Sequence, residues 1–158
     1  TSSSASATIT AVNTARAFVQ TTGFTASPTP IATQAERFAN VVLTNSTTVT
    51  ASRAANGGAG GAAITLLFEV LEYQPGVIRS LQTASIALVS STSGTATITS
   101  VNTAKSFIAD GGYTTTASGG SAFDTVPRWA LTSATQVTAT RVGSGADLTM
   151  YVTVVEQF

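Results

Sequence analysis

The sequence predicts an all-β fold made of two tandem, duplicated antiparallel β-sandwich domains, immunoglobulin-like or jelly-roll-like in kind. Three observations predict it: an internal repeat, short segments in which apolar and polar residues alternate, and runs of Gly, Ser and Asn between those segments. Alternation with a period of two is typical of half-buried strands, and many short strands separated by turn residues are typical of a sandwich. No segment has a convincing helical period, and residues 33–40 have room for a single turn only.

The repeat is clearest near the start of each half. Residues 7–19 read ATITAVNTARAFV, and residues 96–108 read ATITSVNTAKSFI. Residues 41–53 match residues 129–141 in the same way, and both of these segments have a polar turn in the middle, which predicts a β-hairpin in each copy. Self-similarity of this kind is the signature of a repeat architecture, so we predict a tandem duplication.

The repeat sets the predicted domain boundaries. We expect residues 1–73 to form the first β-sandwich and residues 74–158 the second. Residues 77–89 are predicted to be a strand or strand pair that opens the second copy, and the first copy has no counterpart of them. Because a sandwich without one strand has a bare sheet edge, three explanations are open. Residues 77–89 serve the first domain, another chain adds the strand, or residues before Thr1 have been removed.

The last segment of each copy is the most apolar one. Four residues of each segment share one face, and they are Ile64, Leu66, Phe68 and Val70 in the first copy and Leu148, Met150, Val152 and Val154 in the second. A strand this apolar is expected at the centre of a sheet, with one face in the core.

Two smaller features recur in both copies. Asn13 and Asn102 follow the first strand, and we predict that each side chain caps a turn by bonding nearby backbone. Gly23 and Gly112 each precede an aromatic residue, which suggests a bend or bulge with a packed ring behind it.

A charged pair also recurs. Arg53 and Glu72 of the first copy occupy the same repeat positions as Arg141 and Glu156 of the second. We predict that each Arg–Glu pair clamps two neighbouring strands, since duplicated domains retain the determinants of the fold. The alternative interpretation is a ligand-binding site formed by arginine and carboxylate.

Composition excludes much chemistry. The chain has no Cys and no His, only 9% of it is charged, and its formal net charge is zero. Disulfides, thiolate catalysis and the commonest general base are therefore absent. The loop carboxylates Asp110, Asp124 and Asp147 lie far apart in sequence, so we predict no metal site, no cofactor and no enzyme activity. A weakly charged chain also gives no electrostatic footprint for nucleic acid or an anionic membrane, and we expect neither as a partner.

Three aromatic residues are candidate contacts with a partner. Tyr113, Phe123 and Trp129 are the residues of the second copy that we assign to an interface or to glycan contact. For Trp129 an anchor in the core or an interface is the favoured interpretation, rather than a platform for a sugar ring.

The succession of segments resembles small repeat domains encoded in the structural gene clusters of tailed bacteriophages. The resemblance lies in the Val-Asn-Thr-Ala-Lys/Arg segment, the Leu-Thr…Val-Thr-Ala…Arg hairpin, the apolar last strand ending in Val-x-Glu, and residues 75–82, which look like the lead strand of that repeat. It implies a virion component and assigns no catalytic or binding residue.

These observations give one functional hypothesis and one alternative. The first is a non-enzymatic structural component of a phage virion, a capsid decoration protein or a tail or fibre accessory, located in the particle. Its partners would be other virion proteins and itself, as a homo-oligomer with strand addition at the bare edge. The alternative is a carbohydrate-binding adhesin module.

Overall fold

A computed structural model describes residues 3–26, 33–54, 63–116 and 126–158. The predicted all-β fold is confirmed, because the regular elements of these residues are antiparallel strands and two 3-10 turns. None of the described residues form a helix with the length and hydropathy needed to cross a membrane. The elements in chain order are β1 (Ser4–Thr8), β2 (Ala17–Ala26), η1 (Gln34–Glu36), β3 (Ala39–Asn45), β4 (Thr48–Arg53), β5 (Ile64–Glu72), β6 (Ile78–Leu88), β7 (Ser93–Thr97), η2 (Thr103–Lys105), β8 (Ser106–Thr115), β9 (Arg128–Ser133), β10 (Gln136–Thr140) and β11 (Leu148–Gln157).

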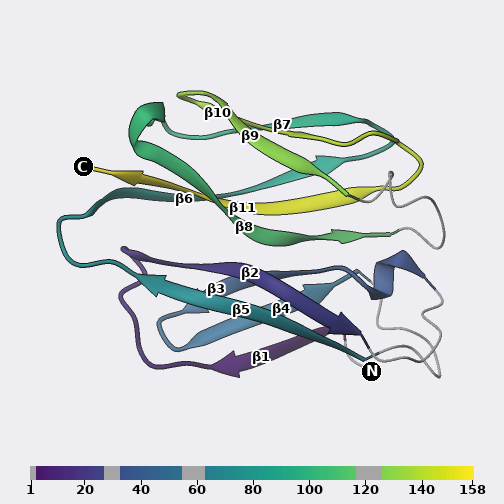
Figure 1. The fold of residues 1–158 in the computed structure, drawn as a ribbon, viewed down its shortest axis with the longest axis horizontal. Coiled ribbons are helices and arrows are strands. Elements are labelled where there is room, and N and C mark those ends of the chain that lie inside the picture. Colours follow the sequence, from purple (N-terminus) through teal and green to yellow (C-terminus); the bar gives the residue numbers. More distant parts are fainter. Residues whose placement is uncertain (1–2, 27–32, 55–62, 117–125) are drawn as a thin grey trace.

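The strands form two lobes, one from β1 to β5 and one from β6 to β11 (Figure 1). In the first lobe the three strands β1-β4-β3, in that order, lie against the pair β2-β5. In the second lobe the three strands β7-β10-β9 lie against the three strands β8-β11-β6. A single bridge, Asn40 with Gly112, joins β3 of the first lobe to β8 of the second. The two ends of the chain lie at opposite ends of the molecule (Figure 1).

The two lobes share one topology and one register. Val19 of β2 lies opposite Val70 of β5, and their repeat counterparts Ile108 and Val154 lie opposite each other in β8 and β11. The pairs of β1 with β4 and of β3 with β4 have their counterparts in β7 with β10 and β9 with β10. The predicted hairpins are confirmed, and the one strand of the second lobe without a counterpart is β6, which pairs with β11.

The predicted bulges are present in both lobes. The register of β2 on β5 shifts between Thr21 and Gly23, and the register of β8 on β11 shifts at the equivalent place before Gly112. The aromatic residues that follow, Phe24 and Tyr113, both contact the ring of Phe38, with centroids 6.0 Å and 4.6 Å away. The glycines therefore turn two repeat-equivalent rings onto one residue of the first lobe.

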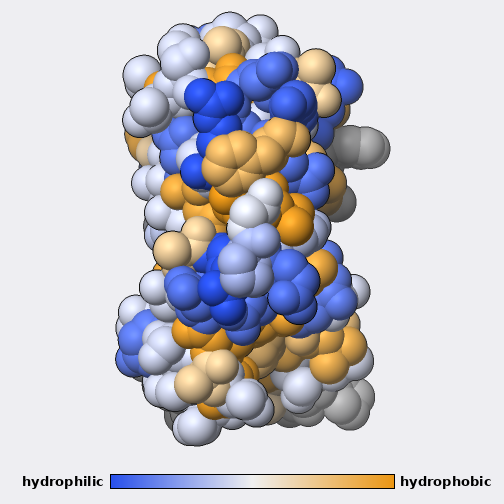
Figure 2. Space-filling model, turned by 90° about the vertical axis from the view of Figure 1, so that its left-hand side faces the viewer, coloured by the Kyte–Doolittle hydropathy of each residue, from blue (hydrophilic) through white to orange (hydrophobic). Residues whose placement is uncertain are grey.

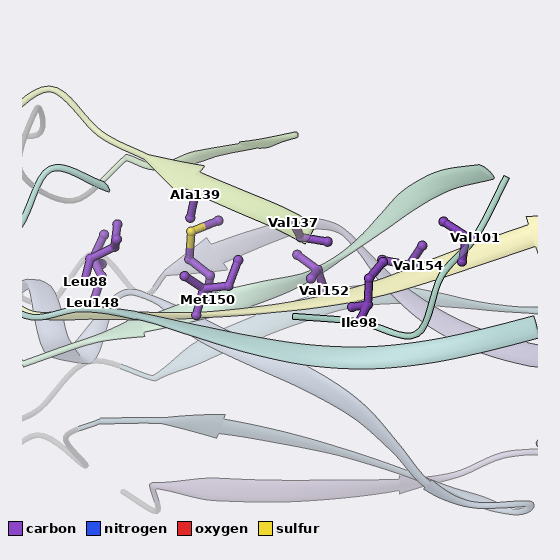
Figure 3. Close-up of a cluster of buried hydrophobic side chains, with 10 residues drawn as sticks. Leu88, Ile98, Val101, Val137, Ala139, Leu148, Met150, Val152 and Val154 are labelled. Atoms are coloured by element: carbon purple, nitrogen blue, oxygen red, sulfur yellow. The ribbon is translucent and has the colours of Figure 1, made fainter. Parts of the chain in front are cut away.

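The second lobe has a closed core (Figure 3). Ile86 and Leu88 of β6 pack with Met150 and Leu148 of β11, and the side chains of these four residues are fully or almost fully buried. They fill the space between the sheet β8-β11-β6 and the sheet β7-β10-β9. Burying each such side chain contributes about 1.5–3 kcal/mol, so β6 is a main determinant of the stability of this lobe.

The prediction that the last strand of each copy is central is right for β11 and wrong for β5. β11 has β8 on one side and β6 on the other, whereas β5 pairs with β2 and with no other strand of the described residues. The physical reason is that residues 78–88 form β6 and pair with β11, so the explanation in which residues 77–89 serve the first domain is wrong.

The lobes meet through the outer face of the sheet β8-β11-β6. Phe18 of β2 lies there against Ala109 and Val155, and its ring is edge-on to Phe107, its own repeat counterpart, at 5.9 Å. Thr21 donates a hydrogen bond across the junction to the Asp110 carboxylate. In the end-on view of Figure 2, hydrophobic side chains reach the surface of both lobes, beside hydrophilic ones.

Candidate strand-binding groove

The outer edge of β5 is unpaired within the described part of the chain. Because a strand edge presents a row of backbone N–H and C=O groups, an uncovered edge is a template for another strand. The same edge of β11, its counterpart, hydrogen-bonds along its whole length with β6.

A groove of about 350 Å³ lies beside this edge, between β5 and β1. Its walls are mostly apolar, with Ala5 and Ala7 from β1, Val49 from β4, and Ile64 and Leu66 from β5 beside several serines and Arg53. The volume exceeds ten times the ~30 Å³ share of one water molecule, so the groove has room for several side chains.

The groove exists because the core of the first lobe is not closed. Met150 and Val154 are 0% exposed in the second lobe, while their counterparts Leu66 and Val70 are only half-buried. The same holds on the opposite sheet, where Ile98 is buried and its counterpart Ile9 is half-buried. These residues at equivalent repeat positions are buried in the lobe that contains β6 and half-buried in the lobe that lacks such a strand among the described residues.

In the second lobe β6 fits tightly against β7. A methyl group on Gly94 would lie 2.8 Å from a methyl carbon of Leu88 and 2.9 Å from the backbone oxygen of Ala87. The first lobe has Ala5 at the position of Gly94. Its methyl group therefore occupies space that β6 fills in the second lobe, and it limits the size of what the groove can hold.

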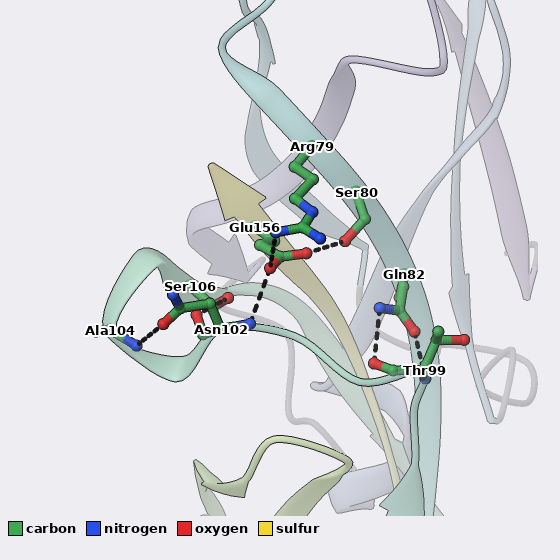
Figure 4. Close-up of polar contacts among 8 residues, drawn as sticks. All are labelled: Arg79, Ser80, Gln82, Thr99, Asn102, Ala104, Ser106 and Glu156. Atoms are coloured by element: carbon green, nitrogen blue, oxygen red, sulfur yellow. Dashed lines mark hydrogen bonds and ion pairs between the residues drawn. The ribbon is translucent and has the colours of Figure 1, made fainter. Parts of the chain in front are cut away.

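A polar clamp fixes the first half of β6 (Figure 4). The side chain of Gln82 donates to the backbone oxygen of Thr99 at 3.0 Å and accepts from its N–H at 2.7 Å. Thr10 is the repeat counterpart of Thr99, and no glutamine of the described residues bonds its exposed backbone in this way.

The predicted Arg–Glu strand clamps are wrong in their partners. Glu72 forms its ion pair with Arg16 at 2.7 Å, and Glu156 lies 3.7 Å from Arg79. Arg53 ends β4 at the start of the connection to β5, whereas Glu72 ends β5. The nine residues of β5 span roughly 30 Å, which separates the two charges.

The two arginines instead bind backbone oxygens. Arg53 is buried and donates to the carbonyl of Glu36 at 3.0 Å. Arg141 is also buried and donates to the carbonyls of Ser91, Ala146 and Leu88. Arg141 thus fastens the end of β6, and Arg53 stands at the same repeat position in the wall of the groove.

The two glutamates hold the turn that follows β1 in the first lobe and the turn that follows β7 in the second. Glu72 accepts from the N–H of Asn13 at 3.2 Å, and Glu156 accepts from the N–H of Asn102 at 2.8 Å (Figure 4). Each asparagine side chain in turn accepts from the N–H two residues later, at 3.0 Å in both lobes. The prediction that these asparagines cap a turn is confirmed.

Replacing Glu156 by glutamine should flatten the acid limb of the stability profile. The Asn102 N–H holds the pKa of Glu156 below its ordinary value of 4.5, against the opposing effect of burial and with help from Ser80, Arg79 and Lys105. The ionised carboxylate therefore stabilises the fold at pH values above its ordinary pKa of 4.5, and this contribution is lost as the pH falls through the lowered pKa of the folded protein. Urea denaturation of Glu156→Gln and of the unmodified protein between pH 7 and pH 3 measures the difference. Parallel acid limbs for the two proteins would contradict this assignment.

The aromatic candidates do not form an exposed cluster in the described residues. Tyr113 is half-buried and stacked on Phe38, and burial together with the charge of Asp110 raises the pKa of its hydroxyl. Trp129 is half-buried and packs against the core of the second lobe, as favoured from the sequence. Phe123 lies outside the described residues.

The acidic residues take part in local contacts. Asp110 lies within β8 rather than in a loop, and burial raises the pKa of its carboxyl while bonds from the Gly112 N–H and Thr21 oppose the rise. Asp147 accepts from the N–H of Ser90 at 3.0 Å. Asp124 lies outside the described residues, within which no three acidic side chains gather as they would around a metal ion.

Comparison of the chain with protein-family models, with curated proteins and with solved structures finds no match.

Proposed function

We propose that this protein is a non-enzymatic structural subunit of a virus particle, a capsid decoration protein or a tail or fibre accessory of a tailed phage, that works through contacts between subunits. The observation that carries the proposal is the unpaired edge of β5 above an apolar groove. A bare edge and an apolar groove are liabilities in a free molecule, and they become contact surfaces in an assembly.

The chemistry of the surface supports contacts of this kind. The groove is lined by Ala, Val, Ile, Leu, Phe and Ser, and the one charged residue among them, Arg53, bonds the carbonyl of Glu36. An interface built from such groups depends on apolar burial and backbone hydrogen bonds rather than on charge.

The arrangement of the carboxylates supports a role without catalysis. Glu72 and Glu156 each hold a turn, Asp110 bonds the backbone of its own bulge, and Asp147 bonds the N–H of Ser90. With no His or Cys in the sequence, an acid–base mechanism would draw chiefly on the seven carboxylates, and four of the seven make these local contacts.

Particles purified from a host that produces the protein should contain it and should retain it in about 1 M salt. At this ionic strength the Debye length is about 3 Å, so contacts based on surface charge weaken while apolar contacts persist. Quantitative mass spectrometry of the particles after sedimentation in low and high salt gives the measurement. Absence of the protein from the particles, or its release by salt, would count against the proposal.

A further inference from the structure

We propose that the first lobe accepts an extended strand from a second polypeptide, which pairs antiparallel with β5 and places alternate apolar side chains in the groove. This inference deepens the proposed function, on which it rests, by naming what one subunit contact consists of. The second lobe supplies the template, since β6 occupies the equivalent place on β11.

The template fixes the register. Leu88, Ile86 and Ala84 of β6 lie opposite Leu148, Met150 and Val152 of β11 and point into the core. The counterparts of these three β11 residues are Ile64, Leu66 and Phe68, all of which line the groove. Residues of the incoming strand opposite these three β5 residues would therefore be the inward ones.

The groove selects the size of one of these residues. Ala5 has a methyl group where Gly94 has none, and at Gly94 that methyl would meet Leu88 and the backbone of Ala87 at less than 3 Å. The contact with the backbone oxygen remains for any side chain, so an incoming strand must lie slightly farther from β1 than β6 lies from β7. A residue smaller than leucine opposite Ile64, such as alanine or valine, removes the side-chain clash and keeps this shift small.

The backbone near Thr10 selects a polar residue. In the template, Gln82 lies opposite Val154 and makes both hydrogen bonds to the backbone of Thr99. A glutamine opposite Val70 would find the backbone of Thr10 at the same repeat position. The preferred strand thus has a glutamine, followed by small or branched apolar residues at every second position.

β6 of a second copy is not the source of the strand. β6 is paired with β11 along its length, and Ile86 and Leu88 are both 0% exposed. Withdrawing β6 to fill the groove of a neighbour would open the same gap in the second lobe, so the exchange would gain no contact.

A synthetic peptide with the sequence of residues 77–91, blocked at both ends and carrying Leu88→Ala, is the probe. Fluorescence anisotropy of the labelled peptide against the full 158-residue chain should show saturable binding. A further Ile86→Thr change in the peptide should weaken binding roughly tenfold or more, because it removes an apolar side chain from the groove. The matched control is Ala87→Thr, on the opposite face of the strand, which should bind as the probe does.

Two variants of the protein make the test specific to the groove. Ala5→Gly should bind the peptide with Leu88 retained about tenfold more tightly than the unmodified protein does, because the obstructing methyl group is gone. Ala7→Phe should abolish binding, since the ring would occupy the groove, and its circular dichroism spectrum should show that the strands are retained.

Two outcomes would overturn the inference. One is the absence of binding by every peptide, or binding that Ile86→Thr and Ala5→Gly leave unchanged. The other is a dimer of the unliganded protein that Ala7→Phe dissociates, because the occupant would then be a second copy. If the peptides do not bind but the protein is present in particles, this inference fails and the proposed function stands. If the peptides bind as expected but the protein is absent from particles, the proposed function fails and strand addition at the groove stands.

Discussion

Replacement of Gly112 by alanine should destabilise the folded protein by about 3 kcal/mol and loosen the junction between the lobes. Gly112 has a φ of 81°, which costs a residue with a side chain about 1–2 kcal/mol. The added methyl carbon would lie 2.5 Å from the backbone oxygen of Ala39 and 3.1 Å from Cα of Asn40, so β3 and β8 would have to move apart. Forcing such a shift in a packed region costs a further 1–3 kcal/mol or so.

Gly76 offers a matched control for that substitution. Its φ is 83°, almost the same, but nothing lies within 4 Å of the position of an added methyl group. Gly76→Ala should therefore cost only the backbone term of about 1 kcal/mol, partly offset by the lower entropy of the unfolded chain. Urea denaturation followed by far-ultraviolet circular dichroism measures both. Equal losses for the two variants would contradict the close approach of the lobes at Gly112.

Replacement of Met150 by alanine should cost about 2–5 kcal/mol, while Leu66→Ala should cost about 1 kcal/mol. The two residues occupy the same repeat position and face the same way. Met150 is 0% exposed in a closed core, so its truncation leaves a cavity. Leu66 faces the groove and is already half-exposed, so its truncation removes fewer contacts and leaves no enclosed space.

The fluorescence of Trp129 allows the unfolding of the second lobe to be measured in both variants. This residue is the only tryptophan of the chain and packs against the core of the second lobe, so its fluorescence reports the unfolding of that lobe. Met150→Ala should shift the denaturation midpoint seen by Trp129, and Leu66→Ala should shift it much less. Similar shifts for the two variants would mean that the cores of the lobes are equally closed.

Local patterns in the sequence predicted most of the fold. The alternation in residues 41–53 and 129–141 gave both hairpins, and the glycine before each aromatic gave both bulges, because these features depend on neighbours in the chain. The turns capped by Asn13 and Asn102 were predicted for the same reason.

The features that were missed depend on contacts between distant segments. The repeat showed that Arg53 and Glu72 recur together. Arg53 is the last residue of β4, before the connection to β5, and Glu72 is the last residue of β5, so the length of β5 separates the two charges. The repeat also showed that a strand was absent from the first copy. The groove could not be predicted, because its walls come from β1, β4 and β5, which are distant in sequence, and its size depends on the one methyl group by which Ala5 differs from Gly94.

The unequal closure of the lobes gives the molecule a polarity. One lobe has its sheet completed by β6, and the other has the equivalent position vacant among the described residues. A partner that pairs with β5 therefore attaches to one lobe and not to the other, and the strand that enters is a different surface from the edge that receives it. Such a contact is heterologous, so it gives the assembly a direction that a contact between two identical surfaces would lack.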